Sequence, residues 1–158
     1  MNSRRRNLLQ TGGGMTLLTM LAAAGWLQPR MAQAADAWNA AAFDTKSMDA
    51  TMKALGGGSP VPSKDITFVQ TPDIAENGAV VPIGVASAIP KTESIAILIE
   101  KNPNMLAASF DIPPGTDPSI TTRVKMGQSS NVFALVKADG KYYVASKEIK
   151  VTLGGCGG

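Results

Sequence analysis

Between Asp65 and Leu153, short apolar or alternating runs follow one another at close intervals, and turn-forming residues bound each of them. This spacing constrains the fold more than any other feature, because runs of this length favour strands over helices. About seven such strands joined by short turns are typical of an immunoglobulin-like antiparallel β-sandwich. The predicted strands cover residues 66–70, 80–86, 94–101, 105–112, 119–126, 131–138 and 141–153.

Three of these runs carry more specific predictions. Residues 94–101 (SIAILIEK) are the most apolar run, which predicts a central strand. Pro82 and Gly84 interrupt the run at residues 80–86, which favours an edge strand or a bulge. Asp139-Gly140 predicts a two-residue hairpin turn whose second strand runs directly into the glycine-rich carboxyl terminus. The Cys…Trp…Cys pattern of antibody domains is missing, so the fold prediction rests on strand count and spacing.

The residues before the strands have a helical pattern. Asp36 is placed to cap a first turn, Asp44-Thr45 breaks the run, and Gly56 stands where a helix usually ends. Met48 and Met52 lie four residues apart and therefore on one helix face. A methionine stripe of this kind more often packs against the chain's own core; the alternative is a docking face for a second chain.

The amino terminus has the order of a secretory signal peptide. A basic segment containing Arg5-Arg6 precedes an uncharged stretch at residues 8–28, and Ala32-Gln33-Ala34 is a small-x-small cleavage sequence. The paired arginines followed by Asn7-Leu8-Leu9 predict twin-arginine export, in which the protein crosses the membrane already folded. The predicted location is the periplasm. A retained signal anchor is the alternative, and the glycines at positions 12–14 together with the cleavage sequence argue against it.

Removal of residues 1–34 changes the charge of the chain. Four of the 15 basic residues and none of the 12 acidic residues lie in this segment, so the formal charge falls from +3 to −1. The basic character belongs to the targeting segment and gives no reason to expect nucleic acid or a membrane as a partner of the mature chain. We divide the mature chain into a helical segment with a linker (35–63), a β-sandwich domain (64–153) and a carboxyl-terminal arm (154–158).

The arm reads Gly154-Gly155-Cys156-Gly157-Gly158 and holds the only cysteine of the chain. Glycine lacks a Cβ atom, so this tail has little width and little preferred conformation. The pattern predicts a thiol on a thin, mobile tether that can enter a narrow pocket of another protein, with mobility beginning at Gly154. A frayed terminus without function is the alternative, but a stray thiol in an exported protein invites unwanted disulfides.

The residue types leave this chain little catalytic chemistry of its own. It has no histidine and one cysteine, which excludes Ser-His-Asp and Cys-His arrangements, histidine metal sites and four-cysteine clusters. Cys156 has the Gly158 carboxylate near it, and the nearest cations, Lys147 and Lys150, lie six or more residues away, so the thiol is not activated as a nucleophile. We therefore expect no catalytic residue, metal or cofactor, and a covalent carrier rather than an enzyme.

At its carboxyl terminus, residues 151–158 (VTLGGCGG), the chain resembles the SoxY family, the sulfur-carrying subunits of the bacterial thiosulfate-oxidising (Sox) system. Residues 72–82 (PDIAENGAVVP), 100–103 (EKNP) and 121–126 (TTRVKM) also look like motifs of that family. The resemblance covers essentially the whole mature chain.

The resemblance implies an immunoglobulin-like sandwich whose Cys156 bonds covalently to the sulfur substrate. It implies a heterodimer with SoxZ, a subunit without an export signal that crosses the membrane with this chain. It also implies that a c-type cytochrome attaches thiosulfate, a manganese hydrolase releases sulfate, and a molybdenum-containing sulfane dehydrogenase oxidises the remaining sulfur. We hypothesise that SoxZ contacts an exposed sheet face and the helix before Gly56, and that replacing Met48 or Met52 by Asp breaks this contact.

Two other classes remain open. In a ubiquitin-like sulfur carrier, the terminal Gly157-Gly158 becomes a thiocarboxylate, but such carriers need ATP-dependent activation in the cytoplasm and have no use for a cysteine before the glycines. In a purely structural β-sandwich, Cys156 forms an intermolecular disulfide.

Overall fold

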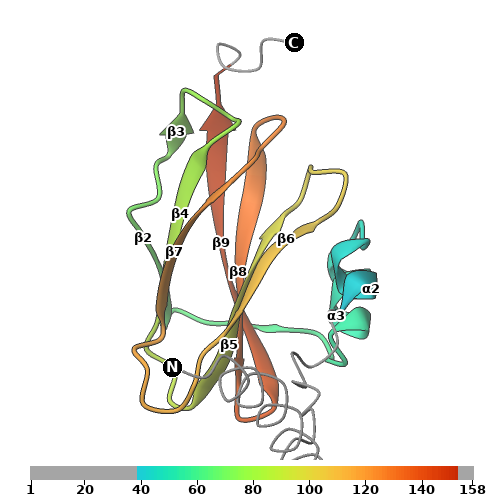
Figure 1. Ribbon diagram of the computed structural model, residues 1–158, viewed down its shortest axis with the longest axis vertical. Coiled ribbons are helices and arrows are strands. Elements are labelled where there is room, and N and C mark those ends of the chain that lie inside the picture. Colours follow the sequence, from blue (N-terminus) through green and yellow to red (C-terminus); the bar gives the residue numbers. More distant parts are fainter. Residues whose placement is uncertain (1–38, 153–158) are drawn as a thin grey trace, which may run out of the picture. The chain divides into compact units, whose positions relative to one another are not determined.

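The computed structural model describes residues 39–152. The predicted signal peptide, Asp36 and the glycine arm lie outside these residues. Two short helices, α2 (Ala40–Phe43) and α3 (Met48–Ala54), precede the strands (Figure 1). The strands in the described part are β1 (Val61–Pro62), β2 (Ile66–Val69), β3 (Ile74–Ala75), β4 (Val81–Ser87), β5 (Thr92–Ile99), β6 (Leu106–Asp111), β7 (Ser119–Val124), β8 (Ser130–Ala138) and β9 (Lys141–Val151).

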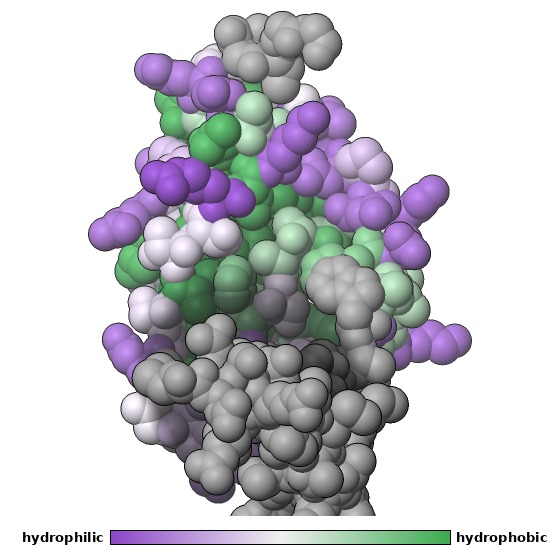
Figure 2. Space-filling model, in the orientation of Figure 1, coloured by the Kyte–Doolittle hydropathy of each residue, from purple (hydrophilic) through white to green (hydrophobic). Residues whose placement is uncertain are grey.

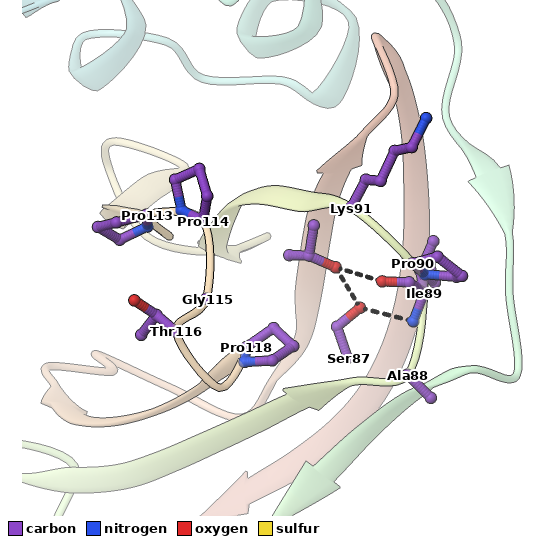
Figure 3. A pocket seen from close by; sticks show the side chains of 11 residues that line it. Ser87, Ala88, Ile89, Pro90, Lys91, Pro113, Pro114, Gly115, Thr116 and Pro118 are labelled. Carbon is purple, nitrogen blue, oxygen red and sulfur yellow. Dashed lines mark hydrogen bonds between the residues drawn. The ribbon is translucent and has the colours of Figure 1, made fainter.

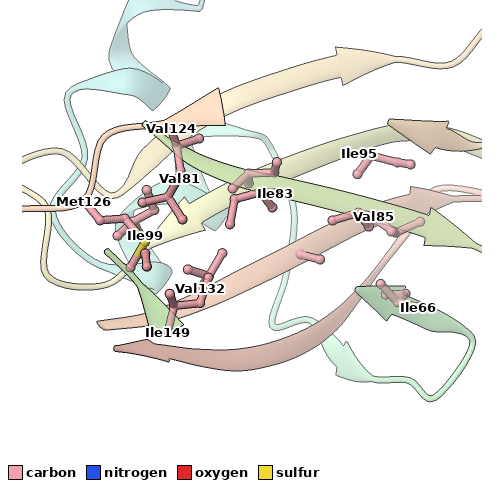
Figure 4. Packing of buried hydrophobic residues seen from close by; sticks show 14 of the residues in the cluster. Ile66, Val81, Ile83, Val85, Ile95, Ile99, Val124, Met126, Val132 and Ile149 are labelled. Atoms are coloured by element: carbon pink, nitrogen blue, oxygen red, sulfur yellow. The ribbon is translucent and has the colours of Figure 1, made fainter. Parts of the chain in front are cut away.

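The strands form two sheets that pack face to face, which confirms the predicted β-sandwich. The larger sheet has the order β1-β9-β8-β5-β6, with β3 also paired to β9, and the smaller sheet has the order β2-β4-β7. Alternate residues of both sheets point inward and form one apolar core (Figure 4). Ile83, Ile97 and Ile149, from three different strands, are fully buried in it.

Two of the specific strand predictions are confirmed. β5 lies between β8 and β6, so the most apolar run of the sequence is an internal strand. Asp139 and Gly140 both have positive φ, 50° and 72°, as the two central residues of a type I′ hairpin turn require. This turn places β9 beside β8 along nearly its whole length, from Ala138 opposite Lys141 to Ser130 opposite Ile149.

The prediction of an edge strand or a bulge at residues 80–86 is wrong, because β4 is the middle strand of the smaller sheet and pairs with β2 and β7 without a register shift. Pro82 is tolerated there because β2 pairs only with the segment from Gly84 to Ser87, so Pro82 has a strand on one side only. Gly84 allows a close approach, since a Cβ atom at this position would collide with the carbonyl oxygen of Val69.

The sandwich is not purely antiparallel. β1 and β3 both run parallel to β9, and both lie along the edge of β9 that faces away from β8. Two-residue strands carry too little periodicity to be recognised in a sequence. They extend the larger sheet at the start and at the end of β9.

The helices cover the outer face of the larger sheet. Met52 is 3% exposed and packs with Leu98 and Leu135 of the sheet in a second apolar cluster. α3 ends as predicted: Gly56 has a φ of 71°, and its N–H donates to the carbonyl of Lys53, as in a Schellman motif. In the described part of the chain, no helix is long and apolar enough to cross a membrane.

The burial of Met52 corrects its proposed use as a reporter of the partner interface. Its side chain lies inside this chain's own packing, so an Asp there would disrupt the fold whether or not a partner docks nearby. Met48 is only partly buried at the rim of the same cluster. Of the two methionines, Met48 is the one that can test docking on the helix.

We predict that Met52→Ala lowers the free energy of unfolding by about 2–5 kcal/mol, because it leaves a cavity between α3 and the sheet. Met48→Ala is the matched control and should cost clearly less, since its side chain is partly exposed. Denaturant unfolding of the two variants measures the difference. Equal losses would mean that the helix is not packed on the sheet as described.

An ion pair joins β5 to the β8–β9 hairpin at the end of the sandwich where β9 begins. One Glu93 carboxylate oxygen lies 3.1 Å from Nζ of Lys137, and the other accepts the N–H of Gly140 at 3.1 Å. The hydrogen bond from Lys137, followed by that from Gly140, lowers the pKa of Glu93 below its ordinary value of 4.5. The same pairing raises the pKa of Lys137.

We expect this carboxylate to contribute to acid stability. Its pKa is lower in the folded state, so its contribution is present above pH 4.5 and is lost as the pH falls through the folded-state value. Glu93→Gln should therefore show a smaller loss of unfolding free energy between about pH 6 and pH 3 than the unmodified protein. Identical pH profiles in denaturant titrations would contradict this assignment.

Candidate functional site at the base of the arm

The predicted attachment residue Cys156 and its flanking glycines lie outside the described residues. What the structure describes is the strand that carries them. β9 ends at Val151, and Thr152 is the last described residue, four positions before the cysteine. The candidate site is therefore the end of β9 together with the loops that hold it, and we call it the arm base.

β9 is held on both sides where it ends. On one side Lys150 and Val151 pair with Ile74 and Ala75 of β3. The pairing continues past the strand, because the N–H of Thr152 donates to the carbonyl of Ala75 at 3.0 Å. On the other side, the N–H of Val151 donates to the hydroxyl of Ser129 at 2.9 Å. The backbone is thus hydrogen-bonded up to Thr152, in agreement with the predicted paired strand before the tail.

Hydrogen bonds also join the surrounding loops to one another. The N–H of Met126 donates to the carbonyl of Gly78 at 2.7 Å. The side-chain amide of Asn102 donates to the carbonyl of Lys125 at 2.8 Å, and its oxygen accepts the N–H of Gly127 at 3.4 Å. The loops after β3, β5 and β7 therefore form one connected support around the end of β9.

Gly78 is the tightest point of this support. It is buried, and a Cβ atom there would collide with the carbonyl oxygen of Met126 and would lie 2.8 Å from Cγ1 of Val151. Gly78 lies in a turn in which the N–H of Val80 donates to the carbonyl of Asn77 at 3.2 Å. A glycine is required here because the backbone approaches Met126 and Val151 closely. Its φ is not positive, so backbone conformation is not the reason.

The three internal segments that resemble the SoxY family meet at the arm base. Residues 72–82 contain β3 and the loop after it, residues 100–103 lie in the loop after β5, and residues 121–126 form the end of β7 and the start of the loop that follows. Gly78, Asn102 and Met126, one from each segment, take part in the hydrogen bonds described above. The sequence identified these segments but could not show that they lie together in space, because the contacts join residues far apart in the chain.

Lys147, one of the two lysines considered for Cys156, is engaged elsewhere. Its Nζ lies 3.0 Å from a carboxylate oxygen of Asp73 and donates to the carbonyl of Thr71 at 2.6 Å. The ammonium group fastens the loop before β3 to β9. Lys150 is exposed on the strand.

A separate cavity of about 320 Å³ lies at the opposite end of the sandwich, where β4 ends (Figure 3). Two loops line it, one running from Ser87 to Thr92 and the other from Pro113 to Pro118. The hydroxyls of Ser87 and Thr92 are 2.9 Å apart, and that of Thr92 donates to the carbonyl of Ile89 at 2.8 Å. These groups serve the loop itself, and the residues lining the cavity include no carboxylate.

The described residues offer no metal site, since no three of their His, Cys, Asp or Glu side chains are grouped to hold an ion. Every buried side-chain nitrogen or oxygen among these residues also has a hydrogen-bond partner.

Together, the two-sheet fold and a supported terminal strand that leads into a glycine-flanked thiol define a small carrier domain. The chain matches the family model of the sulfur oxidation protein SoxY over residues 51–156, more than half its length, and it belongs to this family. The matched region extends to Cys156. SoxY proteins are sulfur carriers of the Sox system, and membership implies a Sox partner such as SoxZ.

A solved structure agrees with the family assignment. The sulfur carrier protein SoxY from Chlorobium limicola f thiosulfatophilum is 39% identical, with a TM-score of 0.59 over 66% of this chain and 94% of that one. A superoxide reductase (neelaredoxin) from Ignicoccus hospitalis is 19% identical, with a TM-score of 0.48 over 55% of this chain and 79% of that one. The second likeness is too low to carry an argument. No curated protein gives a significant match.

We predict that Gly78→Ala weakens the arm base, because the added methyl group must displace Met126 or Val151. The expected loss in unfolding free energy is about 1–3 kcal/mol, and amide hydrogen exchange at Val151 and Thr152 should become faster. Gly127→Ala is the matched control, since a Cβ atom there meets nothing within 4 Å. If both variants behaved alike, Gly78 would not be the tight point of this support.

Proposed function

We propose that this protein carries sulfur intermediates covalently on the Cys156 thiol and presents them to the enzymes of the Sox system. The observation that carries the proposal is the hydrogen-bonded end of β9 at Thr152, four residues before the cysteine. Four extended residues reach at most about 14 Å. The fixed strand end therefore limits the thiol to a small volume beyond the folded domain, which suits delivery into a partner's site.

Loading is an oxidation, so it needs an electron acceptor. The Cys156 sulfur and the terminal sulfur of thiosulfate form an S–S bond, which gives Cys–S–S–SO₃⁻ and releases two electrons and the thiol proton. We assign the electrons to the c-type cytochrome partner, because no described residue of this chain is a redox group. The acceptor also supplies the activation that Cys156 lacks on its own arm.

Release is a hydrolysis followed by a second oxidation. Water replaces the sulfane sulfur on the sulfonate group, so sulfate leaves and Cys156 keeps a persulfide; we assign this step to the manganese hydrolase. A sulfane dehydrogenase then oxidises the persulfide with three waters to Cys–S–SO₃⁻, releasing six electrons and six protons to its own acceptors. A second hydrolysis restores the thiol. We assign the acid, base and electron transfer of these release steps to the partner enzymes.

The location and assembly belong to the same proposal. The twin-arginine type of signal and the pairing with SoxZ together imply that the two subunits fold, assemble and cross to the periplasm as a heterodimer. Once the signal is removed, the formal charge of −1 gives no reason for contact with nucleic acid or a membrane.

The test is to load the purified mature protein, in its native complex, with thiosulfate and oxidised Sox cytochrome. Intact mass spectrometry should show a thiosulfate adduct that reductant removes, and Cys156→Ser should show none. Gly155→Val should slow this loading by on the order of tenfold, because a side chain beside the thiol obstructs a narrow site and misplaces the reacting sulfur.

Alkylation by iodoacetamide is the control for the Gly155→Val variant. This small reagent needs no enclosed site, so its rate should stay close to that of the unmodified protein. An adduct on the Cys156→Ser variant, or modification of the Gly158 carboxylate instead of the thiol, would contradict the proposal. Disulfide dimers as the sole product would favour the structural alternative.

A further inference from the structure

Two exposed apolar side chains flank the arm base. In the described part of the chain three large apolar side chains are exposed, and Ile74 (57%) and Val80 (49%) are two of them. Ile74 lies opposite Lys150 in the β3–β9 pairing, and Val80 follows the turn that contains Gly78. Figure 2 shows apolar surface between charged side chains at the end of the domain where β3 and β9 lie.

We propose that Ile74 and Val80 are the docking contact for the rim of the enzyme site that receives the arm. The inference rests on the proposed function, and it adds where on this chain the enzymes bind. The occupant is a Sox enzyme whose channel mouth presents apolar side chains to these two residues.

The length of the arm supports this occupant. Only residues 153–155 separate the described chain from Cys156, so the Cα atom of Cys156 reaches at most about 14 Å from that of Thr152. An enclosed site that holds Cys156 must therefore bring its outer rim onto the residues around Thr152. A standard footprint of about 800 Å² per partner corresponds to a disc of about 16 Å radius, so a footprint centred on Thr152 covers a distance comparable to this reach.

Ile74 and Val80 lie well within such a footprint. Ile74 is two residues along the paired strands from Thr152, which is about 7 Å. Charges of both signs lie nearby, because Lys125, Lys147 and Lys150 are accompanied by Asp73 and Glu76, and Lys147 is already paired with Asp73. Apolar contact is therefore the stronger source of attraction at this surface.

The backbone of the arm base is built to hold these side chains in place. Ala75, next to Ile74, is buried and accepts the N–H of Thr152. The turn before Val80 is fixed by the N–H of Ala79, which donates to the side chain of Asn77 at 2.9 Å. A preordered apolar contact loses less conformational entropy when a partner covers it.

The experiment compares Ile74→Thr/Val80→Thr with Val61→Thr. Val61 is the third exposed apolar side chain, 54% exposed, and it lies opposite Tyr143, about 25 Å along β9 from Val151. Threonine keeps the β-branched shape, and the single variant Val80→Thr serves if the double variant folds poorly. The readout is the KM for each carrier variant in cytochrome-catalysed loading with thiosulfate, beside the rate of alkylation of Cys156 by iodoacetamide.

We expect the KM of the double variant to rise about tenfold. The single variant Val80→Thr should show a smaller rise in KM, and the KM of Val61→Thr should stay unchanged. The rate at which iodoacetamide alkylates Cys156 should be the same in all three variants as in the unmodified protein. An unchanged KM for the double variant, with loading still on Cys156, would overturn the docking contact and leave the proposed function intact. Faster alkylation would overturn it too, since these residues would then cover the chain's own arm. Loading of Cys156→Ser would instead reject the proposed function.

Discussion

The pairing of β9 with its three neighbours is the interaction on which the rest of the structure depends. β8 lies along one side of β9, while β1 and β3 share the other. At its start β9 holds the helical segment, because the hydroxyl of Tyr142 donates to the carbonyl of Leu55 at 3.1 Å. At its end it supports the arm. One strand thus connects the packing of the domain to the base of the arm.

The arrangement separates stability from chemistry. Apolar residues of the two sheets supply the folding energy, and the sulfur chemistry is assigned to a residue beyond the last strand. The buried core of the described domain is made of residues other than the predicted attachment residue, so the folding core is separate from the proposed cargo. In the proposed function, partner enzymes perform the catalysis and recognise the surface around Thr152.

Periodicity predicted much of this fold. The seven longer strands were visible as apolar runs, and Asp139-Gly140 and Gly56 marked a hairpin and a helix end through backbone conformations that few residues adopt. The two-residue strands β1 and β3 and the central place of β4 were not predictable, since they depend on which segments pair across the sandwich. For the site, the sequence identified the glycine-flanked cysteine. The support made by Gly78, Asn102 and Ser129 became visible only when the loops were placed together.

The central claim is that Cys156 carries sulfur in the cell. The most direct measurement is the intact and terminal-peptide mass of the mature protein, isolated without reductant from cells given thiosulfate. The account predicts sulfur-containing adducts on Cys156 that reductant removes and that cells without a sulfur substrate do not form. A thiol that stays unmodified under every condition, or a modified Gly158 carboxylate, would contradict it.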